Sequence, residues 1–359
     1  MSVYEQFLLN TAPSTKSKTP ELAPQPKSLN QEISAILARE GIKAPKVEVH
    51  VALIQHGTEE DAEGIRKEIL DCDLFAPEGV GHFPEYTELL NELSAGKISL
   101  KEAHERSLKI LGKRPWIGAI LSRLIGFEGF HTRIVQILAG SNKVVMHVDA
   151  PKDSALANET AGALASLVWS MLRVMWKNKA PYDAAAKGVV GSVTKFAVFN
   201  RKREDLMVSS LPAAIAKAIK EHPQLQSPAR TDPIKVFMYL GAAHNRVPKL
   251  LAKPDVAVTS RVADNSKHTG IVGHFHKILM ETRDGKDMTL DDGKVLVLEM
   301  IFSAMLQDAR HALKNRFASA TKKFGGAVIP HILAEVFADK GEEIYTEYKK
   351  HAPSLLRIF

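Results

Sequence analysis

Four residues of this chain are of types that carry hydrolytic chemistry, and each stands beside the end of a predicted element. His56, Glu78 and His244 each follow an apolar run that resembles a buried strand, and Arg203 opens a helical run. Two histidines and a carboxylate can bind a divalent metal ion and leave a position for water. Alternatively, a histidine and a glutamate can activate water as general bases without a metal. The residues alone leave both alternatives open.

Two strand-helix-strand units are expected to position these residues. Residues 47–54 become fully apolar, as a central strand does, and His56 lies just beyond them. A helical run over residues 59–70 then leads to a short strand at 74–76, which ends before Glu78. Two strands joined through a helix predict a parallel pair.

The second unit repeats this order later in the chain. Residues 235–240 form a predicted strand that is followed by His244 and a short helix, and residues 256–259 form the next strand. Another predicted strand, 144–148, precedes Asp149. We therefore expect an α/β fold in which two related strand-helix-strand halves form a mixed, largely parallel sheet, flanked by many helices.

The chain of 359 residues divides into a tail and one domain on composition. Residues 1–28 are rich in Pro, Ser, Thr and Lys and are expected to be a flexible N-terminal tail. Residues 29–359 are predicted to form a single α/β domain with a helical insertion at about 84–138.

Several classes of protein are excluded or disfavoured. A single cysteine, Cys72, rules out a disulfide framework and a cysteine-based zinc site within one chain. The longest apolar run, 160–172, is too short for a membrane span, and the N-terminus lacks the pattern of a secretory signal, so we expect a cytoplasmic protein. Serine hydrolase, P-loop and dinucleotide-binding motifs are absent.

One stretch of the chain is strongly basic. Between Arg173 and Arg203, eight Lys and Arg stand against one acid, Asp183, which accounts for the formal net charge of +7. Such a stretch favours an anionic partner or is a solvated surface. Nucleic acid is disfavoured as the partner, because aromatic residues suited to stacking, such as Trp176 and Phe196, are few in this stretch.

The order of these motifs resembles that of a known superfamily. An apolar strand followed by His56-Gly57, a short strand ending at Glu78, the helix start Arg203-Glu204-Asp205-Leu206-Met207 and the sequence Gly241-Ala242-Ala243-His244 are similar to the erythromycin-esterase/ChaN/Tiki/TraB superfamily. The resemblance spans residues 47–260 and implies two α/β halves with a site between them. Members include esterases, metal-dependent peptidases and a haem-binding lipoprotein.

The expected function is hydrolysis of an ester, amide or related acyl bond of a small-molecule or peptide substrate. His56, Glu78 and His244 are the candidate ligands of a divalent metal ion, or act as general base and acid without one. Arg203 is expected to bind an anionic group of the substrate or a developing oxyanion, and its alternative role is an ion pair with Glu78, Glu204 or Asp205.

Three further positions carry weaker predictions. Arg261 follows the last strand and is a second candidate for substrate binding, and Asp149 is expected to orient a site residue or to form a turn. His274 and His276 alternate along a possible strand. Because Gly57 follows His56 whereas the superfamily places its glycine before the histidine, a binding protein for a metal, haem or peptide ligand on the same fold is the alternative to an enzyme.

Overall fold

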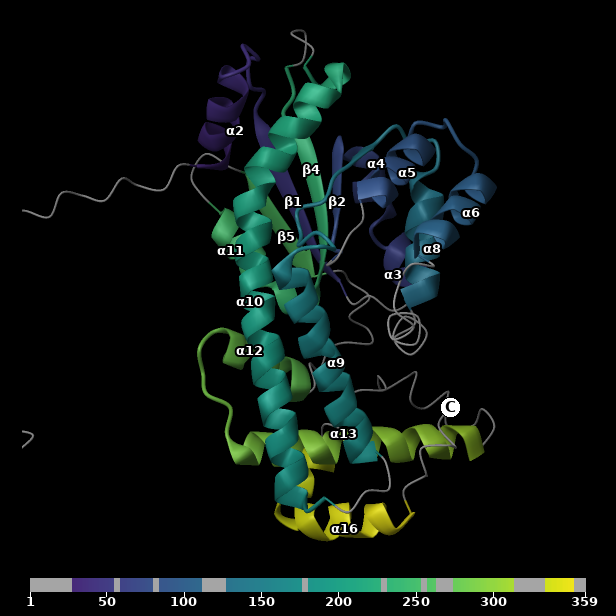
Figure 1. The fold of residues 1–359 in the computed structure, drawn as a ribbon, viewed down its shortest axis with the longest axis vertical. Coiled ribbons are helices and arrows are strands. Elements are labelled where there is room, and N and C mark those ends of the chain that lie inside the picture. The colour runs from purple at the N-terminus through teal and green to yellow at the C-terminus, as the bar shows by residue number, and fades with distance from the viewer. Residues whose placement is uncertain are drawn as a thin grey trace, which may run out of the picture.

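The structure is a computed structural model that describes residues 28–54, 59–79, 84–111, 127–175, 180–226, 231–252, 257–262, 274–312 and 333–351. The predicted tail lies outside the described residues except for Ser28, and His56 lies outside them as well. Figure 1 shows a sheet in the upper half of the molecule and a group of helices below it.

The elements alternate between strands and helices over the first two thirds of the chain. Strands β1 (Val47–Ile54), β2 (Leu74–Pro77), β3 (Val144–Val145), β4 (Ile234–Gly241) and β5 (Val258–Val262) form the sheet. The helices near the sheet are α2 (Leu29–Ala38), α3 (Glu59–Glu63), α4 (Arg66–Asp71), α5 (Pro84–Ser94), α6 (Leu100–Leu111), α8 (Phe127–Leu138) and α11 (Arg246–Leu251). The remaining helices are α9 (Ala155–Met175), α10 (Tyr182–Glu221), α12 (His274–Arg283), α13 (Leu290–Ala312) and α16 (Gly341–His351), with short 3-10 turns η1 (Pro223–Leu225), η2 (Ala242–His244) and η4 (Ala338–Lys340).

The sheet has the strand order β3-β2-β4-β1-β5. Every strand pair among the described residues is parallel. The predicted α/β class is therefore confirmed, and the antiparallel pair that a mixed sheet would contain is absent from the described strands.

Helices cover both faces of the sheet, as a parallel sheet requires. One core lies between the sheet and α2, α10 and α11, and includes Leu29, Met207 and Leu251. The other lies between the sheet and α4, α5 and α8, and includes Ile69 and Leu89. The two faces alternate along each strand, because successive side chains of a strand point to opposite sides.

The connecting helices of the two strand-helix-strand units lie on opposite faces of the sheet. The helices after β1 lie on the face of α4, whereas α11, after β4, lies on the opposite face. The four strands of the two units have the order β2-β4-β1-β5, in which β1 and β4 are neighbours at the centre and β2 and β5 lie outside them. The two units therefore occupy equivalent places when the sheet is viewed from its opposite edges. In open α/β sheets, ligands bind outside the carboxyl ends of adjacent strands whose connections run to opposite faces of the sheet.

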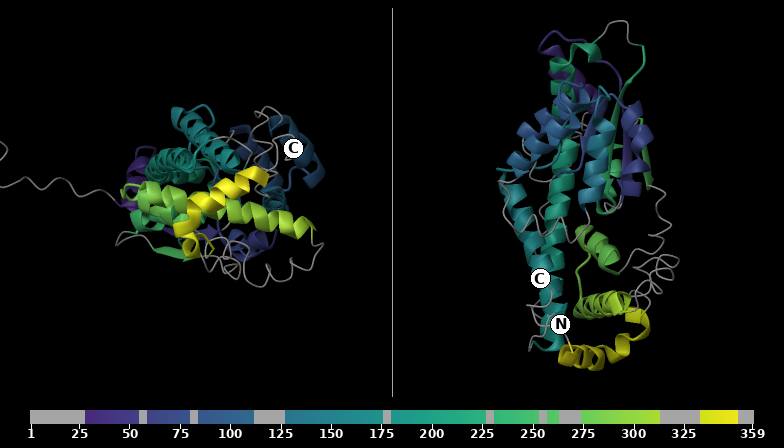
Figure 2. Two further views of the ribbon diagram at one scale, coloured as in Figure 1. Left: turned by 90° about the horizontal axis from the view of Figure 1, so that it is seen from below. Right: turned by 90° about the vertical axis from the view of Figure 1, so that its right-hand side faces the viewer.

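The long helix α10 joins the sheet to a second, helical core. Its C-terminal half packs on the sheet through residues such as Met207 and Ile215. Its N-terminal half packs with α9, α12, α13 and α16 through residues such as Ala186 and Val193. Figures 1 and 2 show α10 running through nearly the whole length of the described molecule, with the helical layer at one end. None of the helices in the described ranges is both long and apolar enough to span a membrane.

Two local predictions were wrong. The helix expected to begin at Arg203 begins at Tyr182, so Arg203 lies near the middle of α10 rather than at a helix end. Glycines and β-branched residues of the segment 188–194 lower its intrinsic helix propensity, but packing against α9 and α13 overrides this preference. His274 and His276 lie in the first turn of α12 and not on a strand.

Candidate functional site

Glu78 lies at the carboxyl edge of the sheet, directly after β2. Its backbone N–H donates to the carbonyl of Tyr239 at 3.1 Å, which extends the pairing of β2 with β4 by one residue. Its side chain accepts from three groups. Oε1 accepts from Arg203 Nη2 at 3.1 Å and lies 3.0 Å from His244 Nε2, and Oε2 accepts from the backbone N–H of Gly241 at 2.5 Å.

Arg203 reaches this carboxylate from the middle of α10. Its guanidinium also binds Asp149 through two hydrogen bonds, Nε to Oδ1 at 3.2 Å and Nη2 to Oδ2 at 2.5 Å, and Nη1 donates to Asn200 Oδ1 at 3.3 Å. Burial by itself would lower the pKa of Arg203, but the charges of Asp149 and Glu78 raise it above its usual value. The side chain is thus a fixed cation that two carboxylates share, which is the ion-pair alternative of the sequence analysis.

His244 approaches Glu78 from the short turn after β4. Its other ring nitrogen, Nδ1, lies 3.6 Å from Glu204 Oε1, an ion-pair distance that exceeds a normal hydrogen bond. Burial alone would lower the pKa of His244 and so would the charge of Arg203, but Glu78 and Glu204 together raise it to about 9. The two carboxylates thus favour the imidazolium form of His244.

Two buried residues of this cluster were not predicted from the sequence as site residues. Glu204 was considered only as an ion-pair partner of Arg203, yet it faces His244. Arg283, at the end of α12, donates from Nη1 to Glu204 Oε1 at 3.0 Å and from Nη2 to Asn245 Oδ1 at 2.7 Å. No local sequence signal marks Arg283 as a site residue, because its partners other than the neighbouring Asp284 come from α10 and from the turn after β4.

The charges of the cluster balance when His244 is protonated. Three buried or nearly buried carboxylates meet two arginines and one histidine (Glu78, Asp149 and Glu204; Arg203, Arg283 and His244). Two buried guanidinium groups do not by themselves neutralise three carboxylates, and an uncompensated charge inside a protein is costly. Positive charge for Glu204 can come both from a protonated His244 and from Arg246. Arg246 adds a partly exposed cation at the border, 3.5 Å from Glu204 Oε2 and 3.1 Å from Asp205.

The structure brings together four of the predicted site residues, Glu78, Arg203, His244 and Asp149. Arg261 lies in β5, where Ala52 of β1 is its partner in the sheet register, and the description does not extend to its side chain. His56 lies outside the described residues, two positions after Ile54, which pairs with Gly241.

The described contacts do not form a metal centre. Within the described ranges, no group of three His, Cys, Asp or Glu side chains could hold a metal ion. The carboxylate of Glu78 instead accepts from a guanidinium, an imidazole and a backbone N–H. A divalent cation at this position would compete with the adjacent Arg203. His56, the third predicted metal ligand, lies outside the described residues.

Fold and site together define a class, namely a parallel α/β protein with a buried cluster of compensated charges at the carboxyl edge of its two central strands. No protein-family model, no curated protein and no solved structure matches this chain.

Proposed function

We propose that this protein hydrolyses an ester, amide or related acyl bond by general base catalysis at Glu78. A contrast in exposure supports this proposal most. The side chain of Glu78 is 17% exposed, whereas those of His244 and Arg203, which contact it, are 3% and 5% exposed. Of the carboxylates of Glu78, Asp149 and Glu204, that of Glu78 is thus the one exposed to solvent, and His244 and Arg203 hold it from the interior.

The proposed reaction begins with a water molecule that donates a hydrogen bond to Glu78. As the water oxygen attacks the acyl carbon, Glu78 accepts its proton. The tetrahedral intermediate then collapses, the bond to the leaving oxygen or nitrogen breaks, and the protonated Glu78 returns the proton to the leaving group. The nearby cations, Arg203 and His244, favour the ionised carboxylate and so promote this return.

Arg203 is proposed to position Glu78 rather than to bind substrate. Its donors already engage Asp149, Glu78 and Asn200. The predicted recognition of an anionic substrate group therefore needs another residue, and Arg261 remains the predicted candidate. The resemblance to the erythromycin-esterase/ChaN/Tiki/TraB superfamily supports an acyl substrate, since esterases and peptidases belong to it.

The decisive experiment compares Glu78→Gln with the wild-type protein on a panel of aryl esters, lactones and peptide amides. Loss of a positioned general base lowers the rate by about 10²- to 10⁴-fold. Glu281→Gln is the matched control, because Glu281 forms an exposed ion pair with Lys286. Circular dichroism verifies that both variants are folded. A Glu78→Gln variant with wild-type turnover would contradict the proposal.

Two additional arms separate the alternatives. Turnover that persists after treatment with a chelator supports the metal-free reaction, whereas turnover that disappears and returns with added zinc contradicts it. If the wild-type protein turns over no member of the panel but retains a metal, haem or peptide through purification, the alternative of a binding protein replaces the hydrolase.

A further inference from the structure

Glu204 and Arg283 form a buried ion pair behind the proposed site. The side chains are 0% and 2% exposed, and 79 positions of sequence separate them. Glu204 belongs to α10 and Arg283 to the last turn of α12, so the pair joins two helices of different parts of the chain. A buried ion pair contributes little net stability compared with an apolar pair, so a specific geometric role is a better explanation for it.

Arg283 holds the chain on both sides of His244. One N–H group donates to the carbonyl oxygen of Ala243, and another donates to the side chain of Asn245. Asn245 in turn donates to the sulfur of Met280, on the same helix as Arg283. The residues before and after His244 are therefore both anchored to α12, which limits the rotation of the short turn that carries the imidazole.

Glu204 lies beside the imidazole ring of His244. It lies on the Nδ1 side, at 3.6 Å, while Glu78 lies on the Nε2 side, at 3.0 Å. The imidazole is thus placed between two carboxylates. The charged groups around it come from every adjoining element: Glu78 after β2, Arg203 and Glu204 on α10, Arg246 on α11, Arg283 on α12, and Asp149 through Arg203.

We infer that Arg283 and Glu204 are positioning residues that hold the His244 ring in the orientation in which it donates to Glu78. This inference rests on the proposed function only for the role of Glu78 as the base. Arg283 fixes the backbone of the turn, and Glu204 favours the ring with a proton on each nitrogen. The helical layer thereby controls the geometry of a site at the edge of the sheet, through α12.

The test is the ring N–H signal of His244 in protein labelled with ¹⁵N-histidine. The chain has 14 histidines, so the signal is assigned by its absence from His244→Gln. In the wild-type protein at neutral pH we expect a ring N–H signal protected from exchange, because the group is buried and bound to Glu78. We expect Glu204→Gln and Arg283→Lys to shift it and to speed its exchange by about tenfold or more, as expected for easier local opening.

Controls separate positioning from general damage to the fold. Arg133→Lys is the matched control, because Arg133 pairs with Glu63 at the surface. If Arg283→Lys fails to fold, the nearly isosteric variant Glu204→Gln tests the positioning role instead. Added guanidinium chloride at low concentration should restore the wild-type ring signal in Arg283→Ala. Variants that fold with an unchanged His244 signal and exchange rate would overturn the inference.

The ring signal of His244 is measured without a substrate, so the outcome of this test does not depend on whether the protein is a hydrolase. If the wild-type protein hydrolyses no substrate but shows the expected ring signals, the proposed hydrolase function is contradicted and the positioning role of Arg283 and Glu204 is supported. If the Glu204→Gln variant is active and its ring signal is unaltered, the positioning role is contradicted and the hydrolase function is unaffected.

Discussion

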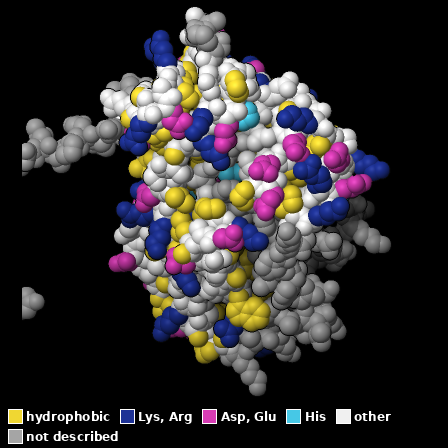
Figure 3. Space-filling view, turned by 45° about the horizontal axis from the view of Figure 1, so that its top comes forward, with side chains coloured by type: hydrophobic (Ala, Val, Ile, Leu, Met, Phe, Trp, Pro, Cys, Tyr) yellow, Lys and Arg dark blue, Asp and Glu magenta, His cyan; other side chains and the backbone are white. Residues whose placement is uncertain are grey.

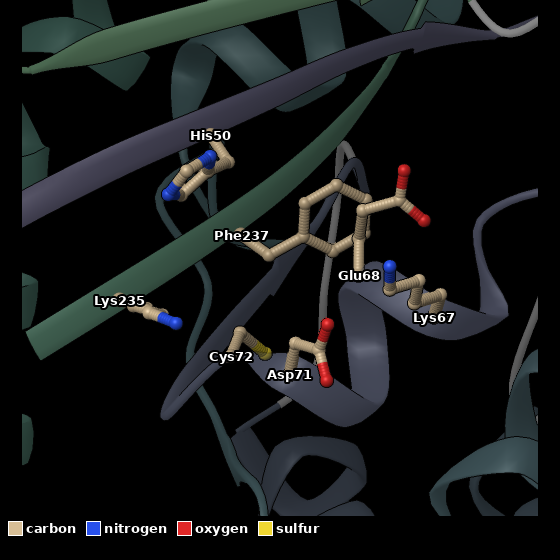
Figure 4. Close-up of a pocket in the computed structure, with 7 residues that line it drawn as sticks. All are labelled: His50, Lys67, Glu68, Asp71, Cys72, Lys235 and Phe237. Atoms are coloured by element: carbon tan, nitrogen blue, oxygen red, sulfur yellow. The ribbon is translucent and has the colours of Figure 1, made fainter.

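Two polar regions on the same central strands differ in how they hold their charges. At the carboxyl edge, the ionisable groups around Glu78 are buried and pair with one another. Toward the amino ends of the strands, on the face of α4, a hollow of about 230 Å³ opens to the surface (Figure 4). Its lining is similarly rich in charged groups and consists of His50, Lys67, Glu68, Asp71, Cys72, Lys235 and Phe237.

The histidines of the two regions, His50 and His244, differ most clearly in burial. His50 is 38% exposed, lies 2.5 Å from Thr259 Oγ1 and stands 3.7 Å from Glu48. His244 is almost fully buried between two carboxylates. Water screens the charges of the hollow, whereas in the interior each charge depends on its partner. Residue type alone therefore does not identify a site, because burial decides whether neighbouring charges are coupled.

On the face in Figure 3, acidic and basic side chains lie interspersed at the surface. Members of the basic stretch follow the same pattern, since Lys202 lies 3.8 Å from Glu159 and Lys187 and Lys195 are exposed. Among the described members of the stretch, Arg203 is the exception and points to the interior.

The largest effect on stability is expected for Arg203→Met. Removing one partner of a buried ion pair leaves an uncompensated charge and costs about 3–5 kcal/mol. Here it leaves both Asp149 and Glu78 without their guanidinium. Urea unfolding measures the change, with Arg133→Met as the surface control. A similar loss in both variants would mean that burial does not distinguish the two regions.

A smaller effect should appear in the pH dependence of stability. The pKa of His244 is about 9 in the folded protein and about 6.5 when unfolded, so its protonation favours folding. This contribution is fully present below pH 6.5 and is lost as the pH rises through 9, a change on the order of 3 kcal/mol.

The measurement is the free energy of unfolding from pH 6 to pH 10 in wild-type protein, His244→Gln and His50→Gln. We expect the decline between pH 6.5 and 9 to be reduced in His244→Gln and to persist in His50→Gln. A wild-type decline that survives unchanged in His244→Gln would show that another group causes it.

The smallest effect is expected in the hollow. Lys235→Ala removes an exposed cation, and substitutions of this kind change stability by about 0.5 kcal/mol or less. Urea unfolding measures this change as well. A loss of several kcal/mol would show that the charges of the hollow are coupled as strongly as those at the carboxyl edge.

Much of the fold followed from local patterns in the sequence. The apolar runs at 47–54 and 235–240 predicted the two central strands, and the helices between strands predicted their parallel pairing. The contact of Glu78 with His244 could be expected, because polar residues directly after buried strands meet at one edge of a parallel sheet. These features depend on short segments, whose periodicity and length are visible without the rest of the chain.

The tertiary structure alone decided which charges meet. Arg203 reaches Glu78 across 125 positions of sequence, because α10 continues as one helix from the helical layer onto the sheet. Arg283 reaches Glu204 only through the packing of α12 against α10. A hydrogen bond between distant residues leaves no periodic pattern in the sequence, since any arginine pairs equally well with any carboxylate. Which pair forms depends on how apolar surfaces far from the site pack together.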